Sequence, residues 1–437
     1  MGDINSPIIF FRLIFFGTKI KRGHSMAENK SRYWVPSRTY EIVLKIGTRD
    51  LTNDIYGLSI ISSVDIPYQT FFLEIVLDSN DIILEEIYGQ TPMKLSVILQ
   101  ATDAYPLERV DFELMYLDSD LILTTKTQNP QDVQKDRTPI TVTAVSKKSY
   151  KTMNTFVNNI FQGGTVEQAI TSLVNGTGAK LKYDTNGKNV EKIDQILIPP
   201  SSLYKNLKYI NRQFGIFDGA PAIFCSYDNT VYIKNMTSKI NAAQVFTIYQ
   251  LGLGSANDDI IKKSNDGKTF YTTDPITTTY KGNSVFATLA PRMIHIVSPR
   301  DRLSHIIDVD LQTFAKKYGI VSKANRMFFD TSTISEKSRI SINKDHTGYE
   351  LTDSFVNANT SLKVANITEM NIKIEKSLRI LNLMDVGESV QVTSRNSNSQ
   401  DVTGRYILKG SEINFLKGQD WESTANLFLM RTNRTIT

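Results

Sequence analysis

Hydrophobic and polar residues alternate along the chain from Tyr40 to about residue 150. In the segment YEIVLKI every second residue from Tyr40 to Ile46 is apolar, and TFFLEIVLD, MKLSVIL, VDFELMYL and ITVTAV continue the pattern. This period is typical of strands that bury one face. Because turn sequences separate these segments, they predict a small β-barrel or sandwich over residues 38–150. The polar residues 124–139 predict a long exposed loop between the last two strands.

The period changes to that of helices between residues 150 and 240. One helix is predicted to end at Gly163 and Gly164, with its apolar residues on one side: Tyr150, Met153, Phe156, Val157 and Ile160. Thr165 and Gln168 then have the spacing of a capping box for a second helix, whose Ile170, Leu173 and Val174 would face a core. The segment AKLKYD predicts a short strand.

Residues 196–235 have the clearest pattern in the chain. Pro199 and Pro200 end an extended segment, and Ser201 or Ser202 can cap a helix that Gly215 would stop. The apolar residues of that helix form one stripe: Leu203, Leu207, Ile210 and Phe214. The segments AIFCSY and TVYIKN flank Asp228 and Asn229, which predict a two-residue hairpin turn with positive φ. Residues 151–240 are therefore predicted to be an α+β region of helices plus a hairpin.

The remaining chain, 241–437, predicts a second small β-barrel with an irregular part at 241–330. In that part, residues 256–275 predict a polar loop, RMIHIVS a strand, and residues 308–319 a short helix. From about residue 335 the alternation returns in SRISINK, EMNIKIEK, ESVQVTSR, RYILKGSEINF and TANLFLMR. The predicted fold class is mainly β with an α+β insertion.

Composition agrees with a folded protein of several domains. Of the 437 residues, 41% are hydrophobic and 22% charged, which is ordinary for a chain that buries real cores. The net charge of +5 comes from 50 basic and 45 acidic residues without a long basic tract, so charge alone does not indicate nucleic-acid binding. The single cysteine, Cys225, alternates with Ile223 on a predicted strand, which favours a packed thiol and allows no disulfide framework.

No segment has the pattern of a reactive site. The four histidines, at 24, 295, 305 and 346, lack metal-ligand spacing. QGGT and LGLGS lack the frame of a phosphate-binding loop and predict turns. Asp308 and Asp310 fit a helix start, and Glu85 and Glu86 a polar turn. The sequence therefore predicts no catalytic, cofactor-binding or metal-binding residues and no cofactor.

The first 37 residues form an extension before the first predicted strand. The apolar run at 8–16 is interrupted by Arg12 and is followed, not preceded, by basic residues, so it fits neither a bilayer span nor a signal peptide. Two interpretations are open: Met26 is the true start, or the run is an anchor that docks into a neighbouring subunit. No stable membrane insertion is expected.

The order of these modules resembles the baseplate hub proteins of contractile-tailed bacteriophages, the late-control-D-like family related to the tail tube. The resemblance covers about residues 38–437 and depends on the order and spacing of degenerate motifs. Its elements are the helix capped by Thr165, the turn at 198–200, the helix through Leu207 and Ile210, the break at Gly215, and the positions Gly387, Val390, Gly404, Tyr406 and Arg431.

The resemblance implies a structural, non-enzymatic protein of the virion, placed in the tail baseplate after assembly in the host cytoplasm. Such hubs are homotrimers in which two tube-like barrels per chain give a ring of six around a channel. They adapt the six-fold tail tube to the three-fold spike. The implied partners are further copies of the chain, the tail spike protein, the tail tube or tube-initiator protein and baseplate wedge proteins. During DNA ejection, DNA would pass through the channel without specific binding.

Since the given sequence ends with FLMRTNRTIT, the spike is expected to be a separate protein. Two other functions stay open from the sequence. One is a tail-associated cell-wall hydrolase with an unrecognised site, and the other is a glycan-binding adhesin built from β-barrels.

Overall fold

The structure, a computed structural model, is mainly β with an α+β region, so the predicted fold class is confirmed. It describes residues 38–78, 92–101, 108–121, 137–190, 192–217, 221–239, 243–252, 260, 268–280, 294–296, 309–310, 339–342, 367–375, 380–394 and 402–432. The predicted loop at 124–139 lies outside these residues except for its last three. The N-terminal extension, Glu85, Glu86 and Asp308 also lie outside them.

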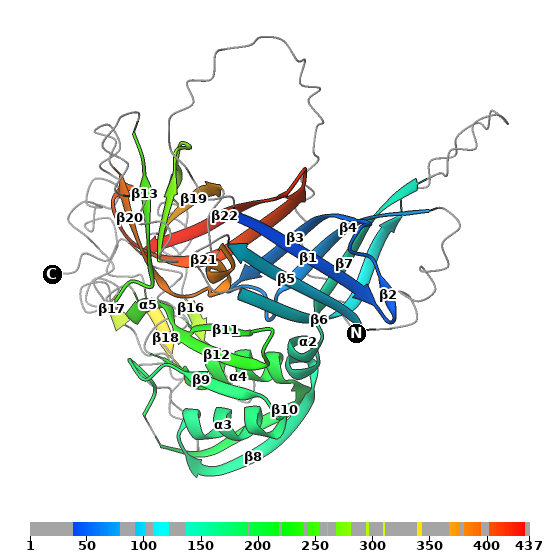
Figure 1. Cartoon of the computed structure of the whole chain (residues 1–437). Helices are drawn as coiled ribbons and strands as arrows, with labels where there is room; N and C mark the ends of the chain where they lie inside the picture. Colours follow the sequence, from blue (N-terminus) through cyan, green and yellow to red (C-terminus); the bar gives the residue numbers. More distant parts are fainter. Residues whose placement is uncertain are drawn as a thin grey trace, which may run out of the picture. The chain divides into compact units, whose positions relative to one another are not determined.

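The strands of the first β region pair side by side and are closed into a ring by the end of the chain. Six strands pair in the order β3-β4-β7-β6-β5-β1. Strand β21 pairs with β3 at one end of this series, and β22 pairs with β1 at the other. Strands β21 and β22 also pair with each other. Figure 1 shows the red C-terminal strands beside the blue N-terminal ones. The strands of this ring are β1 (Arg38–Ile46), β3 (Ile55–Ser63), β4 (Thr70–Asp78), β5 (Met93–Ala101), β6 (Glu108–Leu121), β7 (Arg137–Ser146), β21 (Gly404–Lys417) and β22 (Trp421–Thr432).

Alternate residues of these strands fill one hydrophobic core. Every predicted inward residue of β1, β4 and β5 is buried, because each strand turns its apolar face to the same side. Aromatic side chains join strands that are distant in sequence: the Tyr40 and Phe415 rings lie 5.0 Å apart, as do the Phe71 and Phe112 rings. The short β2 (Arg49–Asp50) extends β1 as a hairpin.

The hairpin β21–β22 also belongs to the second β region. The pairings continue from β21 to β20, β13 and β14, and from β22 to β19 and β15. These strands are β13 (Phe246–Gln250), β14 (Thr269–Thr272), β15 (Thr277–Tyr280), β19 (Ile367–Glu375) and β20 (Ser389–Ser394). The 3-10 helix Ile380–Met384 packs its Ile380 and Leu383 into the same core. The two β regions therefore share one hairpin and one core.

Two predictions for residues 241–330 are wrong in part. The segment 256–275 was expected to be a polar loop, but Thr269–Thr272 forms β14, because Phe270 is buried and the strand pairs in parallel with β13. Val309–Asp310 was expected at a helix start but forms strand β17, which pairs with β18 (Arg339–Ile342). Strand β16 (Ile294–Ile296) also pairs with β18. The rest of the helix expected at 308–319 lies outside the described residues.

The first helix of the α+β region is shorter than its apolar residues predict. Helix α2 covers Lys147–Asn154, and Phe156–Gly164 forms strand β8, which pairs with β10 (Ile193–Ser202). The prediction of a helix through Ile160 is wrong because Thr155 is extended and the following residues alternate as a strand does. Val157 and Phe161 face the core of this region, whereas Phe156 and Ile160 are exposed.

The other two main helices form as predicted. Helix α3 (Val166–Gly176) begins with the capping box of Thr165 and Gln168. Helix α4 (Leu203–Phe214) begins where Ser202 accepts a hydrogen bond from the Lys205 amide and ends at Gly215, whose φ is 71°. The buried Asn189 donates to the last carbonyls of α4, at 2.9 Å and 3.0 Å. The predicted apolar residues of both helices are buried in a core separate from the large one.

The hairpin predicted after α4 is present, with a different turn. Strands β11 (Pro221–Cys225) and β12 (Thr230–Asn235) are antiparallel, and β9 (Lys180–Tyr183) pairs with β12 in parallel. Only Asn229 of the predicted turn pair has positive φ. Three residues, 227–229, connect Ser226 to Thr230. The Asn229 amide donates to Ser226 O and the Ser226 amide donates to Thr230 O, both at 2.9 Å. It is the turn type in which only the last residue needs positive φ. The short α5 (Met236–Lys239) follows.

We expect Gly215→Val to lower the free energy of unfolding by about 1–3 kcal/mol, because a β-branched residue is strained at positive φ. Thermal unfolding followed by circular dichroism measures the effect. The matched control is Gly176→Val at the end of α3, where nothing lies within 4 Å of an added Cβ. Wild-type melting of Gly215→Val would contradict the role assigned to this glycine.

Candidate functional site

Among the described residues, the few with potential chemistry lie on separate elements. Cys225 is fully buried, and burial raises the pKa of its thiol to about 12, so it remains a packed thiol at neutral pH. His295 lies on β16 and Asp310 on β17, while His24, His305 and His346 lie outside the described residues. Within the described ranges, no cluster of His, Cys, Asp and Glu side chains is arranged to hold a metal ion.

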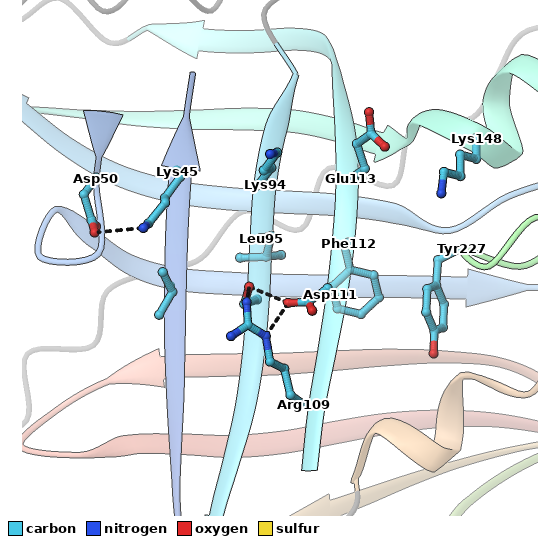
Figure 2. A pocket seen from close by; sticks show the side chains of 12 residues that line it. Lys45, Asp50, Lys94, Leu95, Arg109, Asp111, Phe112, Glu113, Lys148 and Tyr227 are labelled. Carbon is cyan, nitrogen blue, oxygen red and sulfur yellow. Dashed lines mark hydrogen bonds and ion pairs between the residues drawn. The ribbon is translucent and has the colours of Figure 1, made fainter. Parts of the chain in front are cut away.

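A cavity of about 700 Å³ lies against β1, β5, β6 and α2. Figure 2 shows that its wall carries side chains of both charges. The basic ones are Lys45, Lys94, Arg109 and Lys148, and the acidic ones are Asp50, Asp111 and Glu113. No His or Cys is among the residues that line this cavity. The cavity therefore offers side chains of both charges, and its lining includes no imidazole or thiol.

Two aspartates of this cavity, Asp111 and Asp50, are held in the ionised form. Asp111 Oδ1 accepts hydrogen bonds from Ser96 Oγ at 2.6 Å and from Arg109 Nε at 2.7 Å, and these donors lower its pKa. Hydrogen bonds from Thr52 likewise lower the pKa of Asp50. A general acid at neutral pH needs a raised pKa, so neither aspartate suits that role.

The hairpin β11–β12 divides two hydrophobic cores. Ile223, Cys225, Val231 and Ile233 face the core that α3 and α4 cover, whereas Ala222 and Phe224 on the opposite face join the large β core. Successive side chains of a strand point to opposite faces, so one hairpin can contribute to a core on each of its two sides. The hairpin therefore fixes the α+β region to the β structure.

Contacts at the edge of β11 fix it to the first ring of strands. The Cys225 amide donates to Pro67 O at 2.7 Å, and Ser149 Oγ of α2 donates to Ser226 O at 2.6 Å. The rings of Tyr68 and Tyr150 lie 5.3 Å apart beside these bonds. Backbone and side chains thus both contribute to the attachment.

A buried lysine fixes the other end of the hairpin to the second β region. The Lys234 side chain is 3% exposed, and its Nζ lies 2.6 Å from Asp385 Oδ1 and 2.7 Å from Glu388 Oε1. It also donates to Val386 O at 2.8 Å and lies 4.9 Å from the centre of the Tyr232 ring. A buried ammonium group is stable only when its donors are satisfied in this way.

The ion network extends beyond Lys234. Lys239 Nζ lies 3.3 Å from both Glu388 Oε2 and Asp184 Oδ1. Burial by itself would lower the pKa of Lys239, but these carboxylates raise it, so the ammonium stays charged at neutral pH. Asp184 in turn accepts the Asn235 amide at 2.9 Å. The network therefore connects β12, α5 and the turn before β20.

The ion network around Lys234 can be identified in the sequence only once the structure is known. TVYIKN places Lys234 two residues after Tyr232, on the same face of a strand, and a lysine at such an inward position predicts a buried partner. Its partners, Asp385 and Glu388, lie about 150 residues further along the chain, as the 151-residue separation from Asp385 shows. No local pattern identifies them.

We expect Lys234→Met to destabilise the protein by about 3 kcal/mol, because methionine keeps the apolar stem but leaves Asp385 without the Lys234 counter-charge and Glu388 with Lys239 alone. Urea unfolding with a probe in each core measures this change. The control Lys45→Met removes an exposed ion pair with Asp50 and should change stability by less than about 1 kcal/mol. Equal effects of the two variants would refute the role of Lys234.

The turn carboxylate of Asp228 should make stability depend on pH. Burial alone would raise its pKa, but hydrogen bonds from Ser226 and Thr230 outweigh burial, and the pKa is lowered below 3.8. Its contribution is therefore present above the pKa of the unfolded chain and is lost as pH falls through the lower, folded value.

Asp228→Asn should lower stability at pH 6 by about 1 kcal/mol and lose less stability than wild type between pH 6 and pH 3. Urea midpoints at the two pH values test this. Asp420→Asn, at the exposed tip of the β21–β22 hairpin, is the control and should follow wild type. A wild-type pH dependence in Asp228→Asn would contradict the assignment.

None of the helices in the described part of the chain has the length and apolar character needed to cross a membrane. Comparison with curated proteins finds no match to this chain. A family model described as "Bacteriophage PBS1 gene 109 protein" matches residues 115–285, from within β6 to beyond β15. This match includes the whole α+β region and both faces of the β11–β12 hairpin.

Several solved structures are similar to the chain at low sequence identity. The 43 kDa tail protein of prophage MuSo2 from Shewanella oneidensis has 13% identity and a TM-score of 0.49, with 89% of this chain and 98% of that chain covered. A tail protein from Neisseria meningitidis MC58 has 10% identity and a TM-score of 0.47, with 91% and 98% covered.

A third structure, from Escherichia coli, is described as a component of the type VI secretion system with structural similarity to bacteriophage T4 tail proteins. It has 9% identity and a TM-score of 0.45, with 90% of this chain and 77% of that chain covered. The predicted resemblance to bacteriophage proteins is confirmed over residues 115–285, where the chain is similar to a bacteriophage protein family.

Proposed function

We propose that the chain is a structural protein of a phage-type tail, the central hub of a baseplate. The observation that carries this proposal is the bacteriophage family match, which begins in the first ring of strands and continues through the α+β region into the second β region. The match therefore includes the junction that holds the regions together. The polarity of the cavity in Figure 2 agrees with a role in protein contacts.

The hub assembles as a homotrimer. Each chain contributes two tube-like β-barrels, at 38–150 and 241–437, with residues 151–240 as the α+β region. The ring of barrels adapts the six-fold tail tube to the three-fold spike and lines the channel through which DNA is ejected. Its partners are the spike, the tube or tube-initiator protein and the wedge proteins, and its place is the virion tail.

The ends of the large sheet support assembly. Among the described strands, β14 and β15 end the path of paired strands. An open edge presents free amides and carbonyls, so a neighbouring subunit that pairs with it removes the exposed edge. Phe156 on β8, 78% exposed, adds apolar surface that a partner would cover.

The hub has no enzymatic role. The packed thiol of Cys225 and the ionised carboxylates of Asp50 and Asp111 support this part of the proposal. A cell-wall hydrolase would clear peptidoglycan, and an adhesin would bind glycans saturably. Neither activity is expected of the purified chain.

Light scattering of the purified full chain tests the proposal. We expect a stable mass of about three times 49.3 kDa, either for the chain alone or after addition of the spike protein from the same genome. Addition of the tube protein should increase the mass further. A persistent monomer that binds neither protein would refute the hub assignment.

A further inference from the structure

Lys234 brings one amine and two carboxyl groups together in a site with little access to water. Its Nζ lies 2.6 Å from Asp385 Oδ1 and 2.7 Å from Glu388 Oε1, and the lysine side chain is 3% exposed. The rings of Phe224 and Tyr232 lie beside the same nitrogen, with their centres 5.2 Å and 4.9 Å away. An amine and a carboxyl group held in contact are the two reactants of an amide bond.

Contact alone does not distinguish this pair from an ordinary ion pair of the chain. Lys188 Nζ and Glu167 Oε2 lie 2.8 Å apart, but their side chains are 31% and 33% exposed, so water solvates both charges. At Lys234 the amine is buried, and a second carboxylate lies within hydrogen-bond distance of it. Burial and the second carboxylate are the two features that amide formation requires beyond contact.

Burial favours the uncharged form of the Lys234 amine. An ammonium group out of water costs free energy, and the neutral amine costs less. The hydrogen bond from Nζ to Asp385 Oδ1 is the path by which one proton leaves the nitrogen. Transfer along this bond converts the ammonium and the carboxylate into an amine and a carboxylic acid. The amine then has the lone pair that a nucleophile needs.

The position of the nitrogen suits attack on the carboxyl carbon of Asp385. Oδ1 is bonded to Cγ, so an atom 2.6 Å from Oδ1 also lies near that carbon. Well-oriented groups within one molecule react as if at an effective concentration of about 10⁵ M or more. The Asp385 side chain is 49% exposed, so a released water molecule can leave to solvent.

Glu388 is placed to move the proton that the attack releases. Its Oε1 faces Lys234 Nζ, while its Oε2 lies 3.3 Å from Lys239 Nζ, so a second cation positions this carboxylate. A carboxylate within hydrogen-bond distance of the attacking nitrogen can act as a general base. Val386 O, 2.8 Å from Nζ, is an acceptor for the N–H that remains in an amide.

We propose that the chain joins Lys234 to Asp385 by an amide bond between Nζ and Cγ. After the proton transfer to Asp385, Nζ attacks Cγ while Glu388 takes a proton from the nitrogen. The bond from Cγ to the hydroxyl oxygen then breaks, and Glu388 returns its proton to the hydroxyl group, which leaves as water. One ammonium and one carboxylate thus become one amide and one water molecule, without an oxidant or a co-reactant.

The bond links β12 to the turn before β20, between residues that are 151 positions apart. A covalent link across so long a loop restricts the unfolded chain, as a disulfide does. The ion pair is the reactant state, which folding assembles before the bond forms. Because each chain modifies its own side chains once, the inference does not rest on the proposed hub function.

Mass spectrometry of the denatured full chain tests the inference. We expect most wild-type chains to be lighter by one water molecule than their 49.3 kDa sequence. Asp385→Ala cannot form the bond and should keep its calculated mass, so comparison with it cancels any processing at the N-terminus. Trypsin should release one branched peptide of residues 213–239 and 380–395 from the wild type, because the linked Lys234 resists cleavage.

Two comparisons connect the bond to the geometry. Glu388→Gln keeps the length of the side chain but is a poor base, so linking during cell-free synthesis should be about a hundredfold slower. Lys188 and Glu167 are the control within the same wild-type digest, and their peptides should be recovered unlinked.

A wild-type chain with its full calculated mass would overturn the inference, and so would a lost water molecule that maps to another pair of peptides. Linking of Glu388→Gln at the wild-type rate would refute the role of that carboxylate. The wild-type mass decides the main question even where a variant fails to fold. The result is separate from the hub assignment, since a linked chain can stay monomeric and a trimer can form without the link.

Discussion

The burial of the Lys234 ammonium is the constraint on which the arrangement of the chain depends. The group lies on the last part of β12, on the face of the hairpin that meets the large core, and it is 3% exposed. An unpaired charge in that position would be very costly, so Asp385 and Glu388 must be in place for the hairpin to pack there. An apolar residue at position 234 would allow several orientations of the hairpin, whereas the directional hydrogen bonds of the Lys234 ammonium group allow few. The opposite face is apolar and belongs to the other core, so one hairpin joins both.

A second long-range constraint comes from the hairpin β21–β22. The first ring of strands begins at Arg38 but closes only when residues 404–432 pair with β3 and β1. Contacts between residues so far apart require closure of long loops before they contribute stability, which slows folding. Because the same hairpin also pairs with β19 and β20, the two β regions cannot complete their sheets independently. Folding of the two regions is therefore coupled through the last strands of the chain.

Local patterns predicted most of the elements, and long-range pairing explains where they failed. The alternation in β1, β4 and β5 and the capping box at Thr165 depend on neighbours in sequence, and both are present. The helix predicted through Ile160 is wrong because β10, about thirty residues further on, pairs with those residues as a strand. The closing role of β21–β22 and the partners of Lys234 have no local signal at all.

The closed ring determines which backbone groups stay available for other chains. Each of its strands has a neighbour on both sides, although β1 and β22 share only the pair Tyr40–Trp421. In the described structure the sheet path ends instead at β14 and β15, both short strands of the second β region. The separate β8–β10 pair also has strands with one neighbour each, and the apolar Ile160 on β8 is 54% exposed. The described ends of the sheet path therefore lie in the second β region, whereas the first ring presents side chains of both charges in its outer cavity.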